Sequence, residues 1–490
     1  MPILLVVDNP KNWPLRVPGV QCVSAREYLG DRRFNPAGGL KVFNLCRSYA
    51  YQSLGYYVSL LGEARGHRPQ PSITTIQDLK SPGIVRALTQ DLDGLIQQCL
   101  RNLQSETFAL SVYFGHNMAS RYDRLAMRLF GMFPAPLLRA HFVRKKGRWI
   151  VQSVNAITLS EVPDHHLLFL LERYDAYFRR KRWTASRPET HRFDLAILLD
   201  PDEAEPPTQP DGIKKFVKAA EKLGFAVERI DKDDIARIPE FDALFIRVTT
   251  NVNHFSYRFA RRAAAEGLVV IDDPSSIARC MNKVYFAQRM ENNHIPTPRT
   301  LIVHDGNKEQ VANEIGLPCV LKQPDSAFSA GVFKVEDRAA LRAKLDRLLA
   351  ESDLIVAQEF VRTDFDWRVG VLAGQPLYVS KYHMARDHWQ IINQKVRGGR
   401  RYGKVETMAW QDAPKRVVQT AVKAANLMGN GLYGVDLKQL GKKIYVIEVN
   451  DNPTIEVGEE DAVLKDELYE RIMGVFLERV EAGKRRGNGS

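Results

Sequence analysis

The pattern of hydrophobic and polar positions is clearest in the stretch Gly431–Gly458. Both arms of this stretch alternate, which predicts two strands that form a hairpin. The apolar positions are expected to face the core, and they are Val435, Leu437, Tyr445, Ile447 and Val449. The intervening positions carry the polar side chains of Asp436, Glu448 and Asn450.

The expected register of this hairpin brings the polar groups together. A three-residue turn at Gly441–Lys443 pairs Leu440 with Ile444, and counting back places Asp436 opposite Glu448. Opposed carboxylates repel unless a cation lies between them, and hard oxygen ligands suit Mg²⁺. The alternative is a solvated sheet face with incidental acids, but the apolar residues expected on the same face, Leu440, Ile444 and Val446, argue against free solvation.

A second pattern, of short apolar strands alternating with amphipathic helices, begins at Phe193. This alternation predicts a small parallel sheet. The chain has no Gly-rich dinucleotide fingerprint after the first strand and no GxxxxGK[ST] motif, so an ATP site must be built in another way. The expected strands are 195–199, 225–230, 243–248 and 268–272, and the expected helices are 213–223 and 255–266.

The first 190 residues have a less regular pattern. Lys41–Gly66 is rich in tyrosine and has helix-like spacing across Tyr49–Leu61. Thr184–Glu189 is expected to be a linker. Further strands are expected at 3–7, at 106–116 and on both sides of 145–147. Further helices are expected at 167–183 and at 78–102, the second with an interruption near its start at Pro82 and Gly83.

Length and composition bound the class of protein. A chain of 490 residues is expected to form about two to four domains, and 44% hydrophobic residues can supply their cores. The five cysteines are scattered without metal-ligand spacing, which is typical of a reducing compartment. No apolar run reaches the roughly 18 residues that span a bilayer, so we expect a cytoplasmic protein without membrane contact.

The charge is unevenly distributed. The net charge is +12, and Arg121–Arg192 carries 15 basic and 6 acidic residues, a surplus of 15 − 6 = +9. Such a patch favours acidic partners, namely nucleic acid, an acidic peptide or a polyanionic metabolite. A solvated basic surface is the alternative, because no recognisable nucleic-acid-binding motif accompanies the patch.

The tail of the hairpin, Glu448–Pro453, resembles the metal-binding end of the ATP-grasp ligases. In that family an Asp, a Glu and an Asn two residues after the Glu hold the Mg²⁺ of ATP. The resemblance therefore implies that Asp436, Glu448 and Asn450 are metal ligands, with Mn²⁺ as a substitute for Mg²⁺.

The resemblance extends over about Phe193–Leu477 and is to the RimK-like branch, which includes ribosomal-protein glutamate ligases. It rests also on Asp273-Pro274, Ile295–Thr300 and Asp366–Arg368. Lys41–Gly66 resembles the RimK-like N-terminal domain. The implied fold class is α/β with α+β lobes: an ATP-grasp fold, preceded by a small parallel α/β domain and an extra N-terminal α/β module.

The implied division of the chain has four parts. Residues 1–190 form the RimK-like N-terminal accessory domain and 191–275 a pre-ATP-grasp α/β domain. Residues 276–480 form the ATP-grasp domain, with a nucleotide flap lobe at about 300–360 and a metal-binding lobe at about 361–480. Residues 481–490 are expected to be a disordered tail.

The resemblance also assigns roles to single residues. Lysines contact phosphates, a small polar loop closes over them, and the hinge between the lobes holds adenine. The implied cofactor-binding residues are Lys283, Lys322, Ser329, Gly331, Glu359, Phe360, Val361 and, for the ribose, Asp366. The implied catalytic residues are Arg368, Lys381 and Arg397.

One stretch departs from the family pattern. Relatives carry an Arg two residues before the position of Asn393, where this chain has Ile391. Arg386, Lys395 and Arg397 are the candidates that could supply the missing charge. Because acceptor chemistry is decided here, the substrate is not carried over from ribosomal-protein modification.

The function implied is that of an ATP-dependent carboxylate–amine ligase that works through an acyl phosphate. Its partners would be a small-molecule or peptide carboxylate and an amine, with glutamate, another amino acid, or an acidic or ribosomal protein as candidates. A homo-oligomer is expected. The alternatives are a nucleotide-sensing RNA- or ribosome-associated protein and an ATP-grasp kinase.

Overall fold

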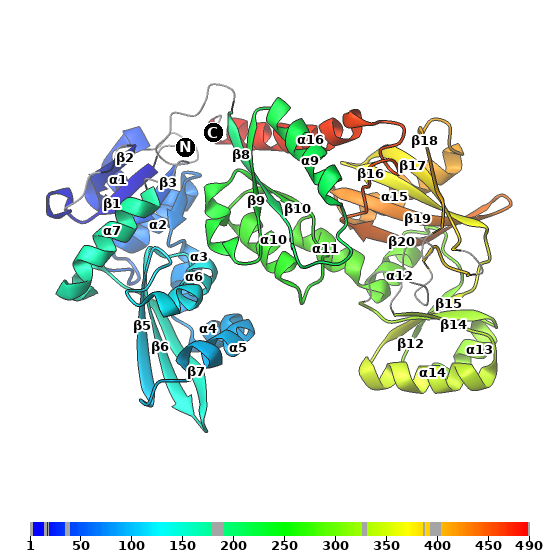
Figure 1. Cartoon of the computed structure of the whole chain (residues 1–490), viewed down its shortest axis with the longest axis horizontal. Helices are drawn as coiled ribbons and strands as arrows, with labels where there is room; N and C mark the ends of the chain where they lie inside the picture. The colour runs from blue at the N-terminus through cyan, green and yellow to red at the C-terminus, as the bar shows by residue number, and fades with distance from the viewer. Residues whose placement is uncertain are drawn as a thin grey trace. The chain divides into compact units, whose positions relative to one another are not determined.

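The computed structural model describes residues 3–13, 17, 19–34, 40–178, 191–325, 331–385, 388–392 and 403–488. The described residues fall into two compact units (Figure 1). The first unit draws on 1–192, 233–240 and 479–490, and the second on 193–232 and 241–478. The end of the accessory domain at 190, as expected from the sequence, stays a prediction. The further division of the second unit at 275 stays a prediction.

The first unit begins with a parallel sheet of four strands in the order β2-β1-β3-β4. The helix expected across Tyr49–Leu61 begins later than predicted, because Ser53 caps the helix by accepting a hydrogen bond from the Tyr56 backbone N–H. The elements are β1 (Ile3–Val7), η1 (Pro10–Asn12), β2 (Val20–Ser24), α1 (Ala25–Gly30), η2 (Arg32–Phe34), β3 (Lys41–Asn44), α2 (Leu54–Ala64) and β4 (Arg68–Gln70).

The remainder of the first unit contains an antiparallel sheet in the order β5-β6-β7. The expected turn at 145–147 is confirmed at the β6–β7 connection, where Lys145 pairs with Arg148. The helix expected over 78–102 is broken at Pro82, which begins α4. The elements are α3 (Ile73–Leu79), α4 (Pro82–Thr89), η3 (Gln90–Leu92), α5 (Asp93–Leu100), β5 (Thr107–Tyr113), η4 (Ser120–Tyr122), α6 (Asp123–Met132), β6 (Leu137–Lys145), β7 (Arg148–Ala156), η5 (Leu159–Glu161), η6 (Asp164–His166) and α7 (Leu167–Phe178).

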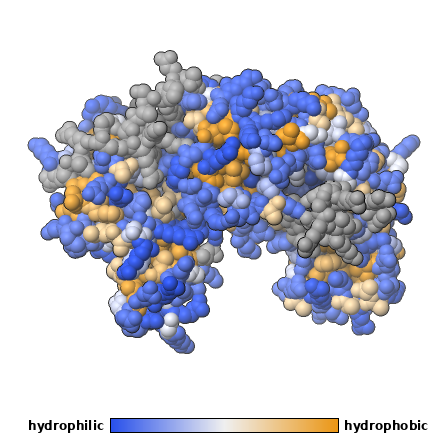
Figure 2. Space-filling model, viewed as in Figure 1, coloured by the Kyte–Doolittle hydropathy of each residue, from blue (hydrophilic) through white to orange (hydrophobic). Residues whose placement is uncertain are grey.

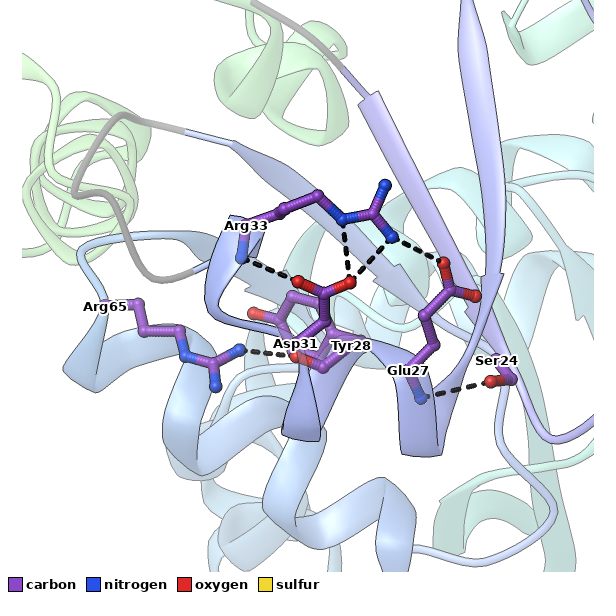
Figure 3. A network of polar contacts seen from close by, with 6 residues as sticks. All are labelled: Ser24, Glu27, Tyr28, Asp31, Arg33 and Arg65. Atoms are coloured by element: carbon purple, nitrogen blue, oxygen red, sulfur yellow. Dashed lines mark hydrogen bonds and ion pairs between the residues drawn. The ribbon is translucent and has the colours of Figure 1, made fainter.

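A polar network holds α1 against the end of α2 in the first unit (Figure 3). Arg65 donates to the Tyr28 carbonyl oxygen at 2.6 Å, and its guanidinium lies 5.0 Å from the centre of the Tyr28 ring. The buried Tyr28 hydroxyl also hydrogen-bonds His67 Nδ1 at 2.8 Å. The neighbouring Arg33–Asp31 pair is solvent-exposed and adds little stability.

The second unit opens with the expected parallel sheet, in the order β11-β10-β8-β9. This confirms the prediction from alternating strands and helices. Its core is partly aromatic, since Phe216 lies edge-on to both Phe245 and Tyr469. The elements are β8 (Phe193–Leu198), α9 (Pro210–Lys222), β9 (Phe225–Ile230), β10 (Ala243–Ile246), α10 (Phe255–Ala265), β11 (Val269–Ile271) and α11 (Pro274–Met281), and η7 (Asp234–Glu240) belongs to the first unit.

Two antiparallel sheets complete the second unit, in the orders β12-β15-β13-β14 and β18-β17-β16-β19-β20. The first carries β12 (Thr300–Val303), β13 (Cys319–Lys322), β14 (Val332–Val335) and β15 (Ile355–Glu359), with α12 (Lys283–Asn292), η8 (Lys308–Gln310), α13 (Val311–Glu314) and α14 (Arg338–Glu351) nearby in sequence. The second carries β16 (Phe365–Leu372), β17 (Gln375–His383), β18 (Val405–Met408), β19 (Leu432–Leu440) and β20 (Lys443–Asp451), with α15 (Lys415–Met428) packed on one face.

The last helix corrects one expectation. α16 spans Asp466–Asn488, so the tail expected to be disordered from 481 is helical to Asn488. The sequence before 488 contains Glu, Arg and Lys, which have good helix propensity and continue a helix that packs through Phe476. Position at the end of the chain was therefore not sufficient to predict disorder here.

The turn of the β19–β20 hairpin is tighter than predicted. Leu440 pairs with Lys443, not with Ile444, so the turn has two residues. A β-bulge between Asp436 and Leu437 then shifts the register by one, and Asp436 still lies opposite Glu448. The predicted pairing at the polar positions is confirmed, whereas the predicted pairing at the turn is wrong.

The bulge also changes which residues of β20 face the core. Ile444 and Val446 are buried beside Leu437, although they were expected on the polar face. Tyr445 and Ile447, expected in the core, are only partly buried. Between the turn and the bulge the strand is one residue out of the predicted register. Because side chains alternate between the two faces, this shift exchanges the core and the polar positions of residues 444–447.

The surface is mainly polar. Figure 2 shows a largely hydrophilic face with scattered hydrophobic residues, as expected for a chain with 26% charged residues. No helix in the described ranges is both long enough and apolar enough to cross a membrane.

We expect the Gly370→Ala substitution to destabilise the second unit by about 1–3 kcal/mol through overpacking. A Cβ at Gly370 would lie 2.3 Å from the ring of Tyr378, which is 1% exposed and has no room to move. The melting temperature checks this. Gly474→Ala in α16 is the control, because a Cβ there meets nothing within 4 Å; an equal loss of stability in both variants would contradict the packing argument.

Candidate active site

Three adjacent strands place the candidate residues on one face of the five-stranded sheet. Arg368 on β16 pairs with Asp436 on β19, which pairs with Glu448 on β20. Directly paired residues share a face, so these three side chains point to the same side. The opposite face carries apolar residues such as Trp367 and Leu437, which pack with α15.

The polar groups form one contiguous cluster. Arg368 binds Asp436 with two parallel hydrogen bonds, Nε to Oδ1 and a terminal nitrogen to Oδ2, each 2.7 Å long. Asn450 Nδ2 lies 3.3 Å from Asp436 Oδ2 and 3.2 Å from Glu448 Oε1. The structure therefore brings the three predicted metal ligands together, with Arg368 as a fourth member.

Burial and neighbouring charges shape the ionisation of this cluster. Burial raises the pKa of Asp436 to about 6, although Arg368 acts against the increase. Burial also opposes ionisation of Glu448, but Lys283 and Lys322 outweigh it and hold the pKa of Glu448 below its ordinary value. Burial in turn lowers the pKa of Lys322 to about 8 and lowers the pKa of Lys283.

The cluster opens onto a cavity of about 580 Å³. Five of the predicted residues line it: Lys283, Arg368, Asp436, Glu448 and Asn450. Ile391, which stands where relatives carry an Arg, lines the same cavity. Other parts of the wall come from the last residue of β20, Asp451, and from the segments after β8, β10 and β20, which include Glu205, Gln209, Thr249, Thr250, Glu456 and Glu459.

Two further predicted residues contact other side chains and are not part of the cavity lining. The Asp366 carboxylate accepts hydrogen bonds from Lys438 at 2.6 Å and from Thr363 at 2.9 Å. Lys381 pairs with Trp367 in the sheet and lies over its ring at 5.2 Å, so its side chain is on the face opposite to Arg368. The structure does not bring Lys381 to the cavity, and its expected catalytic role gains no support.

The predicted hinge and flap residues lie at strand ends. Glu359 ends β15, where its carboxylate pairs with Arg299 at 3.1 Å. The Phe360 ring lies 4.5 Å from Lys334 Nζ, and Val361 is buried. Gly331 precedes β14 and its carbonyl accepts from the Gln323 backbone N–H. Five single residues named from the sequence lie outside the described residues: Ser329, Arg386, Asn393, Lys395 and Arg397.

Sequence reasoning missed Arg247, which fixes the segment after the metal-binding strand. This fully buried residue donates to Asn452 Oδ1 at 2.5 Å and to the Pro453 carbonyl oxygen at 2.8 Å. It also donates to the Pro207 carbonyl oxygen and to Thr208. A charged residue directly after the apolar strand β10 was the available signal.

Sequence reasoning also missed the carboxylates of the cavity wall. The Gln209 backbone N–H donates to Glu456 Oε1 at 3.1 Å, which joins the loop after β8 to the segment after β20. Burial raises the pKa of Glu456 to about 7, and Glu460 and Glu459 add to the increase. Glu460 accepts hydrogen bonds from the Tyr382 hydroxyl and the Glu456 backbone N–H.

Two family models match the chain, and they match separate parts of it. The RimK-like ATP-grasp N-terminal domain matches residues 25–173, and the RimK-like ATP-grasp domain matches residues 280–467. The chain is therefore a RimK-like ATP-grasp protein that carries the associated N-terminal domain, and its fold is the ATP-grasp fold that the sequence predicted.

Relatives of known name agree with this class. A probable alpha-L-glutamate ligase of Teredinibacter turnerae is 26% identical over 56% of this chain and 92% of its own length. A probable alpha-L-glutamate ligase 1 of Pseudoalteromonas atlantica is 27% identical over 51% of this chain and 82% of its own length. A crystal structure of D-alanine–D-alanine ligase from Bacillus anthracis matches with a TM-score of 0.49 and 14% sequence identity. The match covers 60% of this chain and 99% of that structure's chain. The chain is an ATP-dependent carboxylate–amine ligase.

The donor set fits a divalent cation that is shared with a nucleotide. No group of three or more His, Cys, Asp and Glu side chains in the described part of the chain could hold a metal by itself. Asp436, Glu448 and Asn450 instead offer two carboxylates and one amide. Mg²⁺ is commonly held in this way, because substrate phosphates and water complete its coordination.

We expect the Arg368→Ala substitution to destabilise the five-stranded sheet by about 3–5 kcal/mol, because it leaves the Asp436 carboxylate buried without its partner. Hydrogen exchange of the β16 and β19 amides measures the effect locally. In the double variant with Asp436→Ala the loss should be smaller than the sum of the two single losses.

The Arg471→Ala substitution is the control for this cycle. It breaks an Arg–Glu pair with Glu467 of the same 2.7 Å length that is exposed to solvent, and it should leave the exchange of β16 and β19 unchanged. Additive losses for Arg368 and Asp436 would contradict a coupled buried pair.

Proposed function

We propose that the cluster of Asp436, Glu448 and Asn450 holds the Mg²⁺ of bound ATP, with Lys283 and Lys322 on its phosphates. The observation that supports this most is the convergence of two carboxylates, an amide and two lysines at one partly buried site. The metal would supply charge neutralisation between the phosphates and the carboxylates.

The reaction that we propose proceeds in two transfers. A substrate carboxylate oxygen attacks the γ-phosphorus of ATP, the bond to ADP breaks, and an acyl phosphate forms. A neutral amine then attacks the acyl carbon, the C–O bond to phosphate breaks, and the amide and inorganic phosphate leave. The ammonium form of the amine loses two protons in all, one of which remains on phosphate at neutral pH.

The chain's own residues would position the substrates and supply positive charge. Lys283 and Lys322 would bind the phosphate oxygens, while the Arg368 guanidinium would keep Asp436 oriented through its two hydrogen bonds. Phosphoryl transfer needs no covalent side chain, and the cavity lining includes no Ser–His–Asp arrangement among the described residues. The backbone of 359–361 for adenine, Gly331 for phosphate and Asp366 for ribose remain proposals of the same resemblance.

The substrates are proposed at the level of class. The curated relatives are named glutamate ligases, which favours an amino acid as one of the two substrates. Ile391 lines the cavity at a position where relatives carry an Arg, which argues against the same acceptor. The kinase alternative would yield a stable phosphorylated product, and the nucleotide-sensing alternative would yield no substrate-dependent ADP.

We expect Glu448→Ala to lower substrate-dependent ADP release by more than about 100-fold, because it removes a metal ligand from the phosphates. The assay supplies Mg-ATP with a panel of amino acids and small peptides, glutamate included. Hydroxylamine added in parallel traps the acyl phosphate as a hydroxamate. The control Glu467→Gln changes an exposed carboxylate on α16 and should retain full activity.

Near-normal turnover by Glu448→Ala would overturn the metal assignment. ADP release with a phosphorylated product and no hydroxamate would establish the kinase instead. Nucleotide binding without ADP release in any mixture, together with salt-sensitive RNA binding, would favour the sensing role.

We expect the affinity for Mg-ATP to fall as the pH rises through about 8, because Lys322 is a cation below that pKa and neutral above it. For a pKa of about 8 the cationic fraction falls about tenfold from pH 7 to pH 9. Lys322→Arg keeps its charge and should remove most of this dependence. Equal pH dependence in both proteins would show that Lys322 does not contact the phosphates in its charged form.

A further inference from the structure

The antiparallel sheet β5-β6-β7 of the first unit has a covered face and an open face. Helices that include α4 and α5 lie against the covered face, which contributes Leu110, Phe142 and Val151 to the core (Figure 1). Directly paired residues share a face, so the open face consists of residues 107, 109 and 111 of β5, the odd-numbered residues 139–145 of β6 and their partners on β7. Except for Ser111, these residues are exposed or half-buried.

The open face is cationic. It carries Arg139, Lys145 and Arg148 but no Asp or Glu, and Lys146 adds a charge in the turn between β6 and β7. Arg148 pairs with the Asp93 carboxylate, whereas no carboxylate of the described residues forms an ion pair with the other three cations. Residues 106–156 together hold 8 basic and 2 acidic residues, a surplus of 8 − 2 = +6. Much of the basic surplus expected from the sequence therefore belongs to this small sheet.

The outer edge of β5 offers backbone groups for pairing. The Arg144 backbone N–H donates to the Glu106 carbonyl oxygen at 2.8 Å, so the even-numbered residues of β5 bond to β6 and the odd-numbered ones point to the edge. Side chains occupy the carbonyl oxygens of Thr107 and Ser111. Ala109 is left with an N–H and a C=O that have no partner among the residues described, and such a strand edge can pair with another chain.

The cations can reach across β5 to this edge. Ala109 pairs with His141, and Ser111 pairs with Arg139, so only small side chains lie between β6 and the edge. Arg139 Nε lies 3.5 Å from Ser111 Oγ, which shows that this side chain already extends over β5. A strand added beyond β5 would bond to Ala109 through its backbone and would direct alternate side chains toward the cations.

We propose that the open face and the β5 edge bind an extended acidic peptide segment, with Asp or Glu at alternate positions. This surface lies in the first unit and is independent of the proposed ligase function. Single-stranded nucleic acid is the other polyanion that a cationic sheet can bind, but its bases stack on aromatic side chains. The open face has no Phe, Tyr or Trp, and a nucleic-acid backbone cannot pair with a strand edge, so the observations favour the peptide.

Three labelled probes test the preference by fluorescence anisotropy with the full chain. The first is the alternating decapeptide (Glu-Thr)5, the second is its neutral counterpart (Gln-Thr)5, and the third is the RNA U6, which has as many phosphates as the first has carboxylates. We expect the acidic peptide to bind at least about tenfold more tightly than either of the others in 50 mM salt. Its affinity should fall at least about threefold in 200 mM salt.

A matched pair of double variants locates the charge. Lys145→Gln with Lys146→Gln should weaken binding of the acidic peptide at least about fivefold, because two cations at the end of the open face are removed. The control, Lys442→Gln with Lys443→Gln, makes the same change of charge in the exposed turn between β19 and β20 and should leave the affinity unchanged.

A second pair of variants tests the strand edge. Ala109→Pro removes the N–H that a peptide carbonyl would accept, without removing a hydrogen bond to β6, and should weaken binding at least about fivefold. Ala109→Ser keeps the N–H and a small side chain, and should bind like the unmodified protein. If the proline disturbs the sheet, the lysine variants still decide whether the open face binds the peptide.

Four results would overturn the proposal. The first two are absence of binding by the acidic peptide and equal binding of the neutral peptide. The third is tighter binding of U6, which would assign the face to nucleic acid instead. The fourth is an equal loss of affinity in the two double-lysine variants, which would show that the peptide responds only to net charge. Unchanged binding by Ala109→Pro would exclude pairing at the β5 edge.

Discussion

The buried ion pair between Arg368 and Asp436 is the interaction on which the candidate site depends. It joins β16 to β19 by two charge-assisted hydrogen bonds on the polar face of the sheet. Because the pair is desolvated, it holds Asp436 in one orientation and at the correct distance from Asn450 and Glu448. A buried pair of this kind adds little net stability compared with apolar residues, so its value lies in fixing geometry.

A second constraint connects the metal-binding hairpin to the small parallel sheet. Arg247 follows β10, and its guanidinium binds Asn452 and Pro453, immediately after the hairpin. The Asn452 backbone N–H in turn donates to Asp272, after β11. The small sheet therefore acts as a support for the hairpin and supplies part of the cavity wall, which gives a physical reason for its place ahead of the ATP-grasp domain.

The charges of the cavity are separated by the strands and segments that carry them. Lysines and carboxylates face one another at the cluster of Asp436, Glu448 and Asn450, as a site for a polyanion with its cation requires. The segments after β8 and β20 add the carboxylates of Glu205, Glu456 and Glu459 to the wall, and the buried Arg247 guanidinium partly offsets the increase in the pKa of Glu456.

The sequence by itself determined the parallel sheet, the ATP-grasp class and the pairing of Asp436 with Glu448, because each follows from local alternation or a short motif. It misassigned Ile444 and Val446, since a bulge that moves them to the core depends on packing against α15. It brought Lys381 to the site, whereas strand pairing turned that side chain to the other face. Arg247 and Glu456 acquire their contacts only where segments distant in sequence meet, and only the tertiary structure brings those segments together.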